Sequence, residues 1–396
     1  MELISRHQKT IEFEGQDIHL PLFLDHQSTT PLAPQVRSLM LEVMAFPGNA
    51  ESDSHVFGFQ AQAIIQNAKA EVAALINAYP DEIIFTSGAT EANNLALHGP
   101  LSLRPNTETL LTTQIEHSSI LTTAQALEKR GHKLCQLPVA QDGTLDVSKL
   151  QTAIASTEVA LVSVQMANNE IGTLQNIFEI GALCQKENIL FHCDAVQAAT
   201  TQAIDVKRDQ LSLLSLSSHK IYGPQGIGAL FVKRGTPLSP VILGGGQQEN
   251  RRAGTLPTAL IAGFGEASRL ARQCRDTDRK HLMHISNLFK KELRHQLGAN
   301  IQFNGSETSH IPGCISATFT GIEAVDLLLE IPELALSTGS ACASHAATPS
   351  HILTALGLDA KTAGSTVRIG LGRYVTETES RYSANLIAKT YLNLVT

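Results

Sequence analysis

Lys220 lies in the run Ser217-Ser218-His219-Lys220-Ile221-Tyr222-Gly223-Pro224, between an apolar stretch at residues 211–216 and a Gly-Pro turn. A strand that ends in such a turn presents one lysine at the end of a sheet, beside small hydroxyl residues and a histidine. A desolvated lysine loses its proton readily and can form a Schiff base with an aldehyde. Most lysines are solvated surface charges, so this run indicates a catalytic lysine only in combination with the segments that follow.

The run Thr86-Ser87-Gly88-Ala89-Thr90-Glu91 follows a short apolar stretch and turns into a helix. Backbone N–H groups and the dipole at such a helix start attract phosphate. Gly88 permits the tight turn and Thr90 adds a hydroxyl, while Ser217 and His219 would supply further donors. An ordinary capped helix has the same pattern, so the run is consistent with either interpretation.

Three further segments carry groups that suit an aromatic cofactor. Asp194 ends the strand-like run 189–193, and a carboxylate there can keep a pyridine nitrogen protonated, which makes the ring an electron sink. The same residue also suits a helix N-cap. Gln197 could reach a ring hydroxyl, His117 could stack on the ring, and Asn169 could orient the cofactor. A structural histidine and a turn-capping asparagine are the plainer interpretations of the last two.

Cys342 stands in Ser337-Thr338-Gly339-Ser340-Ala341-Cys342-Ala343-Ser344-His345, a run of small or polar residues. Small residues allow a loop to move easily and leave its sulfur accessible. Catalysis needs a thiolate, whereas a free thiol has a pKa of about 8.5. A tightly packed helix cap is the alternative, because residues 349–358 look helical. We favour a mobile nucleophile and expect the other five of the six cysteines to be small buried hydrophobes.

Arg368 lies in Thr366-Val367-Arg368-Ile369, which alternates like a strand and points the arginine to one face. A guanidinium there could clamp a substrate carboxylate with two parallel hydrogen bonds, or form a surface ion pair. The amine, the anion-binding turn, the ring carboxylate, the reactive thiol and this clamp are together the parts of a pyridoxal 5′-phosphate (PLP) site.

The elements that must position these groups alternate between strand and helix. Residues 60–78 have a helical apolar period, and short buried strands are expected at residues 82–85, 158–164, 189–193 and 227–232. Such alternation predicts an α/β fold with a mainly parallel sheet covered on both faces, and ligands bind at the carboxyl ends of its strands. A polar helix near residues 266–297 is expected to lead into a second domain.

Composition and charge argue against several classes of function. The 396-residue chain has a formal net charge of −7, which does not suggest broad nucleic-acid or membrane binding, and no apolar run approaches a membrane span. The start, Met1-Glu2-Leu3-Ile4-Ser5-Arg6, lacks the apolar core of a signal peptide, so a cytoplasmic protein is expected. The cysteines have no metal-like spacing, and no metal site is predicted.

The motifs resemble the class V aminotransferase family and, closely, its cysteine desulfurases. The likeness runs from Phe23-Leu24-Asp25 to the end of the chain. The matching runs are Leu24-Asp25-His26-Gln27-Ser28-Thr29-Thr30-Pro31, Thr86-Ser87-Gly88-Ala89-Thr90-Glu91, Asn168-Asn169-Glu170-Ile171-Gly172, His219-Lys220-Ile221-Tyr222-Gly223-Pro224 and Arg252-Ala253-Gly254-Thr255-Leu256-Pro257. The run ending in Cys342 is similar to the long-loop branch of these enzymes.

The resemblance implies a PLP-dependent fold type I, with a seven-stranded-type sheet in a large domain at residues 29–275. Residues 1–28 and 276–396 would form a smaller α+β domain that carries the cysteine loop. Lys220 would bind PLP covalently, and Cys342 would carry a persulfide. His117 would be a third catalytic residue, stacked on the cofactor ring. The implied cofactor contacts are Ala89, Thr90, His117, Asn169, Asp194, Gln197, Ser217, Ser218, His219, Lys220 and, from the neighbouring subunit of a homodimer, Thr255. Asn49 and Arg368 would hold the substrate carboxylate.

The activity implied is conversion of L-cysteine to L-alanine, with sulfur passed to an acceptor protein. The acceptor pathway could be iron–sulfur cluster assembly, tRNA thiolation or DNA phosphorothioation. A selenocysteine lyase, another class V enzyme, or a catalytically idle sulfur-transfer subunit are the alternatives. The chain departs from the family pattern at Ala50, where proline is usual, and at Gln247-Gln248-Glu249-Asn250, which replaces an acidic-then-basic pair.

Overall fold

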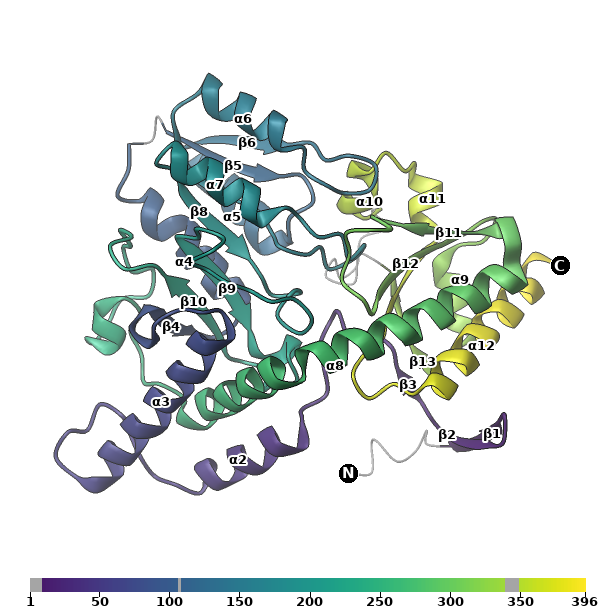
Figure 1. The fold of residues 1–396 in the computed structure, drawn as a ribbon, viewed down its shortest axis with the longest axis horizontal. Coiled ribbons are helices and arrows are strands. Elements are labelled where there is room, and N and C mark those ends of the chain that lie inside the picture. Colours follow the sequence, from purple (N-terminus) through teal and green to yellow (C-terminus); the bar gives the residue numbers. More distant parts are fainter. Residues whose placement is uncertain (1–8, 106–107, 339–348) are drawn as a thin grey trace.

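The computed structural model describes residues 9–105, 108–338 and 349–396 (Figure 1). Its larger body is built around a seven-stranded sheet with the order β4-β10-β9-β8-β7-β5-β6. The strands in that order are Ile83–Thr86, Gly228–Val232, Leu213–Ser217, Leu190–Asp194, Val159–Ser163, Thr109–Thr113 and Lys133–Leu137. β10 runs antiparallel to β4 and β9, and the other neighbouring pairs are parallel. The predicted mainly parallel α/β sheet is therefore confirmed.

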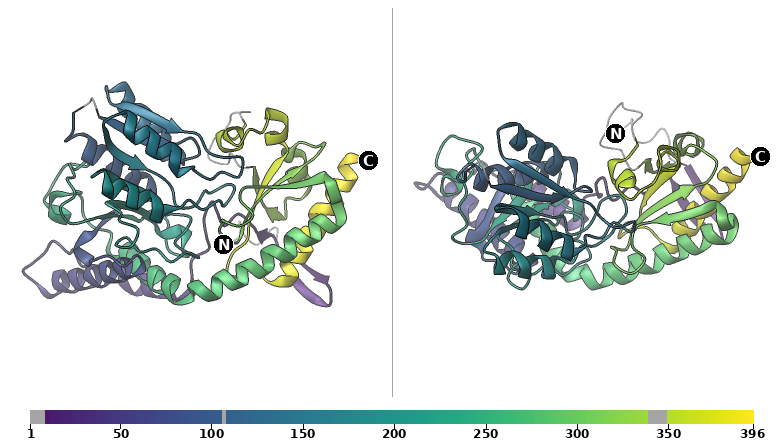
Figure 2. Two further views of the ribbon diagram at one scale, coloured as in Figure 1. Left: turned by 45° about the horizontal axis from the view of Figure 1, so that its top comes forward. Right: turned by 90° about the horizontal axis from the view of Figure 1, so that it is seen from above.

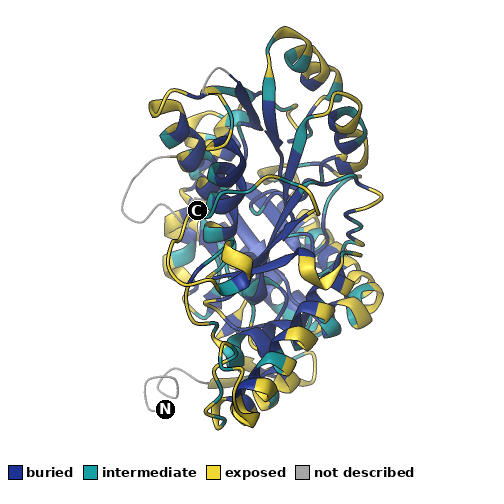
Figure 3. Cartoon of the chain, turned by 90° about the vertical axis from the view of Figure 1, so that its left-hand side faces the viewer, coloured by how far each residue is buried: buried dark blue, intermediate teal, exposed yellow. Residues whose placement is uncertain are grey.

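Helices cover both faces of this sheet because successive strand residues point to opposite sides. Ile84 packs with the apolar faces of α4 (Ala89–Leu101) and α5 (Ser118–Lys129). Its neighbours Ile83 and Phe85 pack with the helices of the other face, which are α2 (Pro34–Met44), α3 (Val56–Leu75), α6 (Val147–Ser156), α7 (Ile177–Lys186) and the start of α8 (Thr258–Leu297). Figure 3 shows the strands buried beneath helices whose outer faces are exposed.

A smaller body carries a four-stranded antiparallel sheet with the order β11-β12-β15-β14. Its strands are Ile301–Asn304, Cys314–Phe319, Thr366–Gly370 and Ser337–Thr338. The second half of α8, α9 (Ala324–Glu330) and α12 (Glu377–Val395) pack with this sheet in a separate apolar core. The short helices α10 (His351–Ala355) and α11 (Ala360–Gly364) pack instead with Ile115 and Ile171.

Short strands complete the smaller body. β1 (Lys9–Phe13) and β2 (Gln16–Leu20) form an antiparallel pair, and β3 (Leu22–Phe23) runs parallel to β13 (Leu334–Ala335). Single 3₁₀ turns occur at η1 (Pro80–Glu82), η2 (Ser218–Lys220) and η4 (Gly298–Asn300), whereas η3 (Gln247–Asn250) contains two residues with left-handed backbone angles, Gln248 and Glu249. Among the described residues, no helix is both long enough and apolar enough to span a bilayer.

The 40-residue helix α8 runs along both bodies (Figure 2). At 1.5 Å per residue it is about 60 Å long, which is enough to contribute to both cores. Phe264 belongs to the core of the larger body and Phe289 to that of the smaller one. The predicted boundary between residues 275 and 276 falls inside this helix, and the domain limits stay a prediction.

An ion pair between Asp278 of α8 and Arg373 lies close to the point where the two bodies meet. Arg373 donates from Nε and Nη2 to both Asp278 carboxylate oxygens at 3.0 and 2.7 Å, and its guanidinium lies 4.3 Å from the ring centre of Tyr222. The Arg373 backbone N–H also donates to the Tyr222 hydroxyl at 2.6 Å. The pair therefore links the middle of α8, the end of β15 and the segment that follows Lys220.

Replacing Asp278 with alanine should lower the free energy of unfolding by about 3 kcal/mol, because it leaves a largely buried guanidinium without its carboxylate. Urea titration of the apoprotein measures this change. Glu377→Ala is the matched control, since it breaks only exposed pairs, with Arg381 and with His284 of α8, and should change stability little. Equal free energies of unfolding for both variants would show that the buried pair stabilises the contact between the two bodies no more than the exposed pairs do.

Candidate active site

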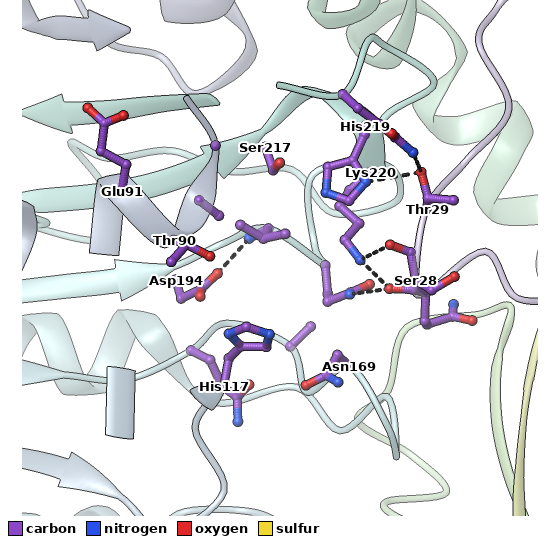
Figure 4. A pocket seen from close by; sticks show the side chains of 18 of the residues that line it. Ser28, Thr29, Thr90, Glu91, His117, Asn169, Asp194, Ser217, His219 and Lys220 are labelled. Carbon is purple, nitrogen blue, oxygen red and sulfur yellow. Dashed lines mark hydrogen bonds between the residues drawn. The ribbon is translucent and has the colours of Figure 1, made fainter. Parts of the chain in front are cut away.

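A cavity of about 640 Å³ opens between the two bodies, at the carboxyl ends of β8 and β9 and at the start of α4. Of the predicted site residues, those that line it are Ala89, Thr90, His117, Asn169, Asp194, Gln197, Ser217, His219, Lys220 and Arg368. Figure 4 shows Lys220 and His219 on one side of this space, with Thr90 and Asp194 across from them. The structure therefore gathers into one site residues that lie as much as 279 positions apart in the chain, from Ala89 to Arg368.

The anion-binding turn joins β4 to α4. Gly88 is the N-cap of α4 and supplies no side-chain cap, so the first N–H groups of the helix stay available to a ligand in the cavity. Glu91 holds the turn from outside, because its carboxylate accepts from Ser87 N–H at 2.7 Å and from Arg252 Nε at 2.7 Å. Burial opposes its charge, yet the hydrogen bonds from Arg252 and Ser87 lower the pKa of Glu91.

Gly228 of β10 lies directly beneath this turn. A Cβ atom at residue 228 would come within 2.7 Å of both the Gly88 carbonyl carbon and the Leu216 carbonyl oxygen. Those contacts are backbone atoms and cannot move aside without shifting the turn or the sheet. A glycine is therefore required for the turn to approach the sheet, a constraint that the sequence alone did not reveal.

Lys220 ends the 3₁₀ turn that follows β9, and its Nζ reaches across the cavity wall to the segment 27–30. Nζ donates to the carbonyl oxygens of Gln27 and of Ser28, the latter at 2.7 Å. The neighbouring His219 places Nδ1 3.1 Å from the Thr29 hydroxyl. Burial, together with the charge of Lys220, lowers the pKa of His219 to about 4, so this histidine is neutral at physiological pH and can donate one hydrogen bond.

Asp194 and His117 face the same cavity from the ends of β8 and β5. The Asp194 oxygens accept from Val196 N–H at 3.1 Å and from the side-chain amide of Asn93 at 2.8 Å. His117 is the N-cap of α5, and burial lowers the pKa of its imidazole. Gln197 lines the cavity as well, with its amide donating to the Gln27 carbonyl at 3.0 Å.

A guanidinium closes the side of the cavity formed by the smaller body. Arg368 is 3% exposed, and its Nη2 donates to Asp25 at 2.8 Å. Its Nε has no hydrogen-bond partner in the described part of the chain, and the same holds for the buried Oδ1 of Asn169. Both residues line the cavity, so a ligand with a carboxylate and a donor would satisfy them.

Three predicted contacts lie elsewhere within the described residues. The buried hydroxyl of Ser218 lies against Gly223 and does not line the cavity. Asn49 is exposed, and its Oδ1 accepts from Glu51 N–H at 3.0 Å. Thr255 is exposed on the loop before α8 and does not line this cavity. Cys342 lies outside the described residues.

Other residues of the site were not predicted from their own sequence signals. The carbonyls of Gln27 and Ser28 bind Lys220, and Asp25 pairs with Arg368, although these residues were noted only as part of a family motif. Asn93 and Ser119 support Asp194 and His117 from behind. Buried polar residues inside helices were the available signal for this pair. No group of three or more His, Cys, Asp or Glu side chains in the described ranges could hold a metal.

The residues present fit PLP. The turn at Ser87–Thr90, with Ser217 and His219, offers donors for a phosphate, and Asp194 offers a carboxylate for a protonated pyridine nitrogen. Lys220 provides the amine for an aldehyde carbon, and the unpartnered Asn169 Oδ1 and Arg368 Nε offer an acceptor and a donor, respectively, to a polar ligand. The volume is in the range usual for a cofactor with its substrate.

A family model described as Aminotransferase class-V matches residues 22–381. The chain is 43% identical over 373 residues to the mitochondrial cysteine desulfurase of Saccharomyces cerevisiae. The aligned residues make up 93% of this chain and 74% of the yeast protein. It is also 40% identical over 372 residues to the cysteine desulfurase IscS of Rickettsia bellii, and these residues make up 93% of this chain and 90% of that protein.

Solved structures agree with these sequence matches. A NifS-like protein superposes with a TM-score of 0.87 at 28% identity, covering 94% of this chain and 99% of that one. SspA in complex with cysteine superposes with a TM-score of 0.79 at 33% identity, covering 89% and 99%. The chain therefore belongs to the class V aminotransferase family and, within it, to the cysteine desulfurases.

Proposed function

We propose that the protein is a PLP-dependent enzyme that converts L-cysteine to L-alanine and retains the sulfur as a persulfide on Cys342. The observation that carries this proposal is the meeting of Lys220, Asp194 and the anion-binding turn on one cavity, which Arg368 of the smaller body also lines. Relatives named cysteine desulfurase support it, as does the cysteine complex of SspA, to which this chain is similar.

The cavity residues would hold the cofactor from several sides. Its phosphate would lie at the start of α4, its ring nitrogen beside Asp194, and its aldehyde carbon on the amine of Lys220. When bound, PLP supplies an electron sink for bonds broken next to the substrate amine. The hydrogen bonds that Lys220 donates to Gln27 and Ser28 would keep its amine within reach for moving a proton at the substrate α-carbon.

Arg368 would orient the substrate. Its Nη2 is bonded to Asp25, while Nε remains available to a substrate carboxylate. Fixing that carboxylate would hold the substrate in the cavity that Lys220 also lines. Asn169, whose backbone carbonyl accepts from Arg368 Nη1 at 3.4 Å, helps to hold the guanidinium in place.

The sulfur step needs one nucleophilic thiolate. The Cys342 thiolate would attack the substrate sulfur, so that an S–S bond forms as the substrate C–S bond breaks and the substrate carbon takes up a proton. L-cysteine and the enzyme thiol thereby become L-alanine and the enzyme persulfide. The other five thiols suit this role less. Burial raises the pKa of Cys184 and Cys314 to about 12 and also raises that of Cys193, whereas Cys135 and Cys274 are half-buried away from the cavity, contrary to the expected full burial.

A homodimer is also part of the proposal. Exposed apolar side chains gather near α2 and α3 and on the loop before η3 of the larger body: Leu41, Met44, Val56, Phe57, Phe59, Val241, Ile242 and Leu243. Leu243 is 79% exposed and follows the exposed Val241 and Ile242, and such a contiguous apolar run is typical of a protein–protein contact. Thr255 lies on the same stretch of chain and would reach the partner's cofactor phosphate. The sulfur acceptor would be a separate protein.

Lys220→Ala should remove the visible absorbance of the PLP-loaded protein, because the cofactor loses its covalent attachment. Borohydride treatment followed by peptide mapping should locate the reduced cofactor on Lys220 in the native protein and nowhere in the variant. Lys207→Ala is the control, since this lysine stacks on Tyr79 at the surface. Cofactor trapped on any other lysine would contradict the assignment.

Cys342→Ser should bind PLP normally and still change its spectrum on addition of L-cysteine, because the cavity residues are untouched. Alanine release and persulfide formation should fall by about a thousandfold or more, as expected when a nucleophile is removed. Cys274→Ser should keep both activities. Near-normal alanine release by Cys342→Ser would overturn the persulfide step and indicate a lyase.

Thr255→Ala should weaken PLP binding by about tenfold, the value of one hydrogen bond to a charged group, without changing the free energy of unfolding. Leu243→Asp should shift the protein from dimer to monomer in sedimentation velocity and weaken PLP binding as well. A fully active monomer of the native sequence would show that the cavity is complete in one chain.

A further inference from the structure

Hydrogen bonds connect Asp194 to His117 behind the cavity wall, through two residues that do not line the cavity. Asn93 of α4 is completely buried, and its Nδ2 donates to Asp194 Oδ2 and to Ser119 Oγ, both at 2.8 Å. Ser119 Oγ in turn lies 2.8 Å from His117 Nδ1. The series joins the ends of β8 and β5 through the first turns of α4 and α5.

The direction of these bonds follows from chemistry. A carboxylate oxygen only accepts, so the group of Asn93 that faces Asp194 must be its NH₂ and not its carbonyl oxygen. Both NH₂ hydrogens are then used, one for Asp194 and one for Ser119. The Asn93 Oδ1 has no hydrogen-bond partner among the described residues, a cost consistent with an orientation set by the two acceptors.

The bond from Asn93 also orients the hydroxyl of Ser119 toward His117. Because its oxygen accepts from Asn93, its own hydrogen can point at His117 Nδ1. The Ser119 backbone N–H lies 3.1 Å from the same ring nitrogen and also donates to it. With donors at Nδ1, a neutral imidazole must carry its proton on Nε2, the nitrogen farther from Ser119.

We propose that Asn93 and Ser119 are positioning residues of this site, which orient the Asp194 carboxylate and hold His117 as its Nε2–H tautomer. The inference deepens the proposed desulfurase function and rests on it for its chemical purpose. Two groups that would touch the cofactor ring from different directions are thereby held in one fixed relation. His117 is presented to the cavity as a hydrogen-bond donor, not as a base.

The electrostatic surroundings agree with a neutral His117. Burial lowers the pKa of its imidazole, Lys220 and His351 act in the same direction, and Asp194 opposes them. The adjacent Glu116 adds little negative charge at neutral pH, because burial raises the pKa of its carboxyl to about 8. Donors at Nδ1 favour the neutral ring further, since they bind the form that has a free lone pair.

The test is a nitrogen-15 NMR titration of histidine-labelled apoprotein, with the His117 signal identified by its loss in His117→Gln. The native protein should show an unprotonated Nδ1 and a protonated Nε2. Ser119→Ala removes a donor to Nδ1, and Asn93→Ala frees the Ser119 hydroxyl to turn away. Both variants should therefore raise the pKa of His117, and Ser119→Thr, which keeps the hydroxyl, should restore it.

Asn94→Ala is the matched control, since Asn94 neighbours Asn93 on α4 but donates to the Thr90 carbonyl and does not contact Asp194. It should leave the His117 titration unchanged. Asn93→Ala should also weaken PLP binding by about tenfold, measured by equilibrium dialysis, through the lost bond to Asp194. An unchanged His117 titration in both Asn93→Ala and Ser119→Ala would overturn the inference.

The two levels of the proposal fail separately. The NMR measurement uses apoprotein and needs neither cofactor nor substrate, so it reads the positioning role even if no alanine is produced from L-cysteine. Absence of alanine production by the native protein would instead overturn the desulfurase function alone.

Discussion

The hydrogen bonds of residues 25–30 join the two bodies and position the two cations of the cavity. On the smaller body, Asp25 accepts from Arg368 at 2.8 Å. On the larger body, the Ser28 carbonyl accepts from Lys220 at 2.7 Å, and the Thr30 hydroxyl donates to the His219 carbonyl at 2.9 Å. Any movement of this segment would therefore change the distance between the amine and the guanidinium, which line the same cavity.

This segment can lie where it does only because residues 370 and 372 are glycines. A Cβ atom at residue 370 would come within 2.5 Å of the His26 nitrogen, and one at residue 372 within 2.0 Å of the His26 ring. The His26 N–H donates to the Gly370 carbonyl at 3.3 Å, in the space that a side chain would fill. The close approach brings Asp25 within reach of Arg368 and so links backbone packing to the electrostatics of the cavity.

Burial also sets which groups around the cavity carry charge. It lowers the pKa of His192, beneath Asp194 in β8, to about 3 and raises the pKa of Glu170 to about 7. The Glu170 carboxyl accepts from the Ser350 hydroxyl at 2.6 Å and lies near Arg368. With His219 neutral and Glu116 protonated at neutral pH, the charged side chains that line the cavity are Glu91, Asp194, Lys220 and Arg368, the last of which is paired with Asp25.

Local sequence patterns were enough to predict five of the seven strands of the larger sheet and the residues at their ends, whereas β5 and β6 were not predicted. The strand expected at 227–232 is β10 at Gly228–Val232, and that at 189–193 is β8 at Leu190–Asp194. These patterns reflect short-range chemistry: apolar runs must be buried in a sheet, and polar residues at the carboxyl ends of parallel strands meet at one edge. Lys220, Asp194 and Thr90 could be assigned to one site for this reason.

Long-range packing decided which of these groups contact one another. The contacts of Lys220 with Gln27 and Ser28, of Asp25 with Arg368, and of Asn93 with Asp194 join residues far apart in the chain, and no local period encodes them. The Ser218 hydroxyl is buried against Gly223 and away from the cavity, in space that only a glycine leaves, which a one-dimensional motif cannot show. The sequence by itself determined which chemical groups the site would contain and which strand ends would carry them. Only the tertiary structure decided which group faces which, because that depends on two bodies meeting across one crossing segment.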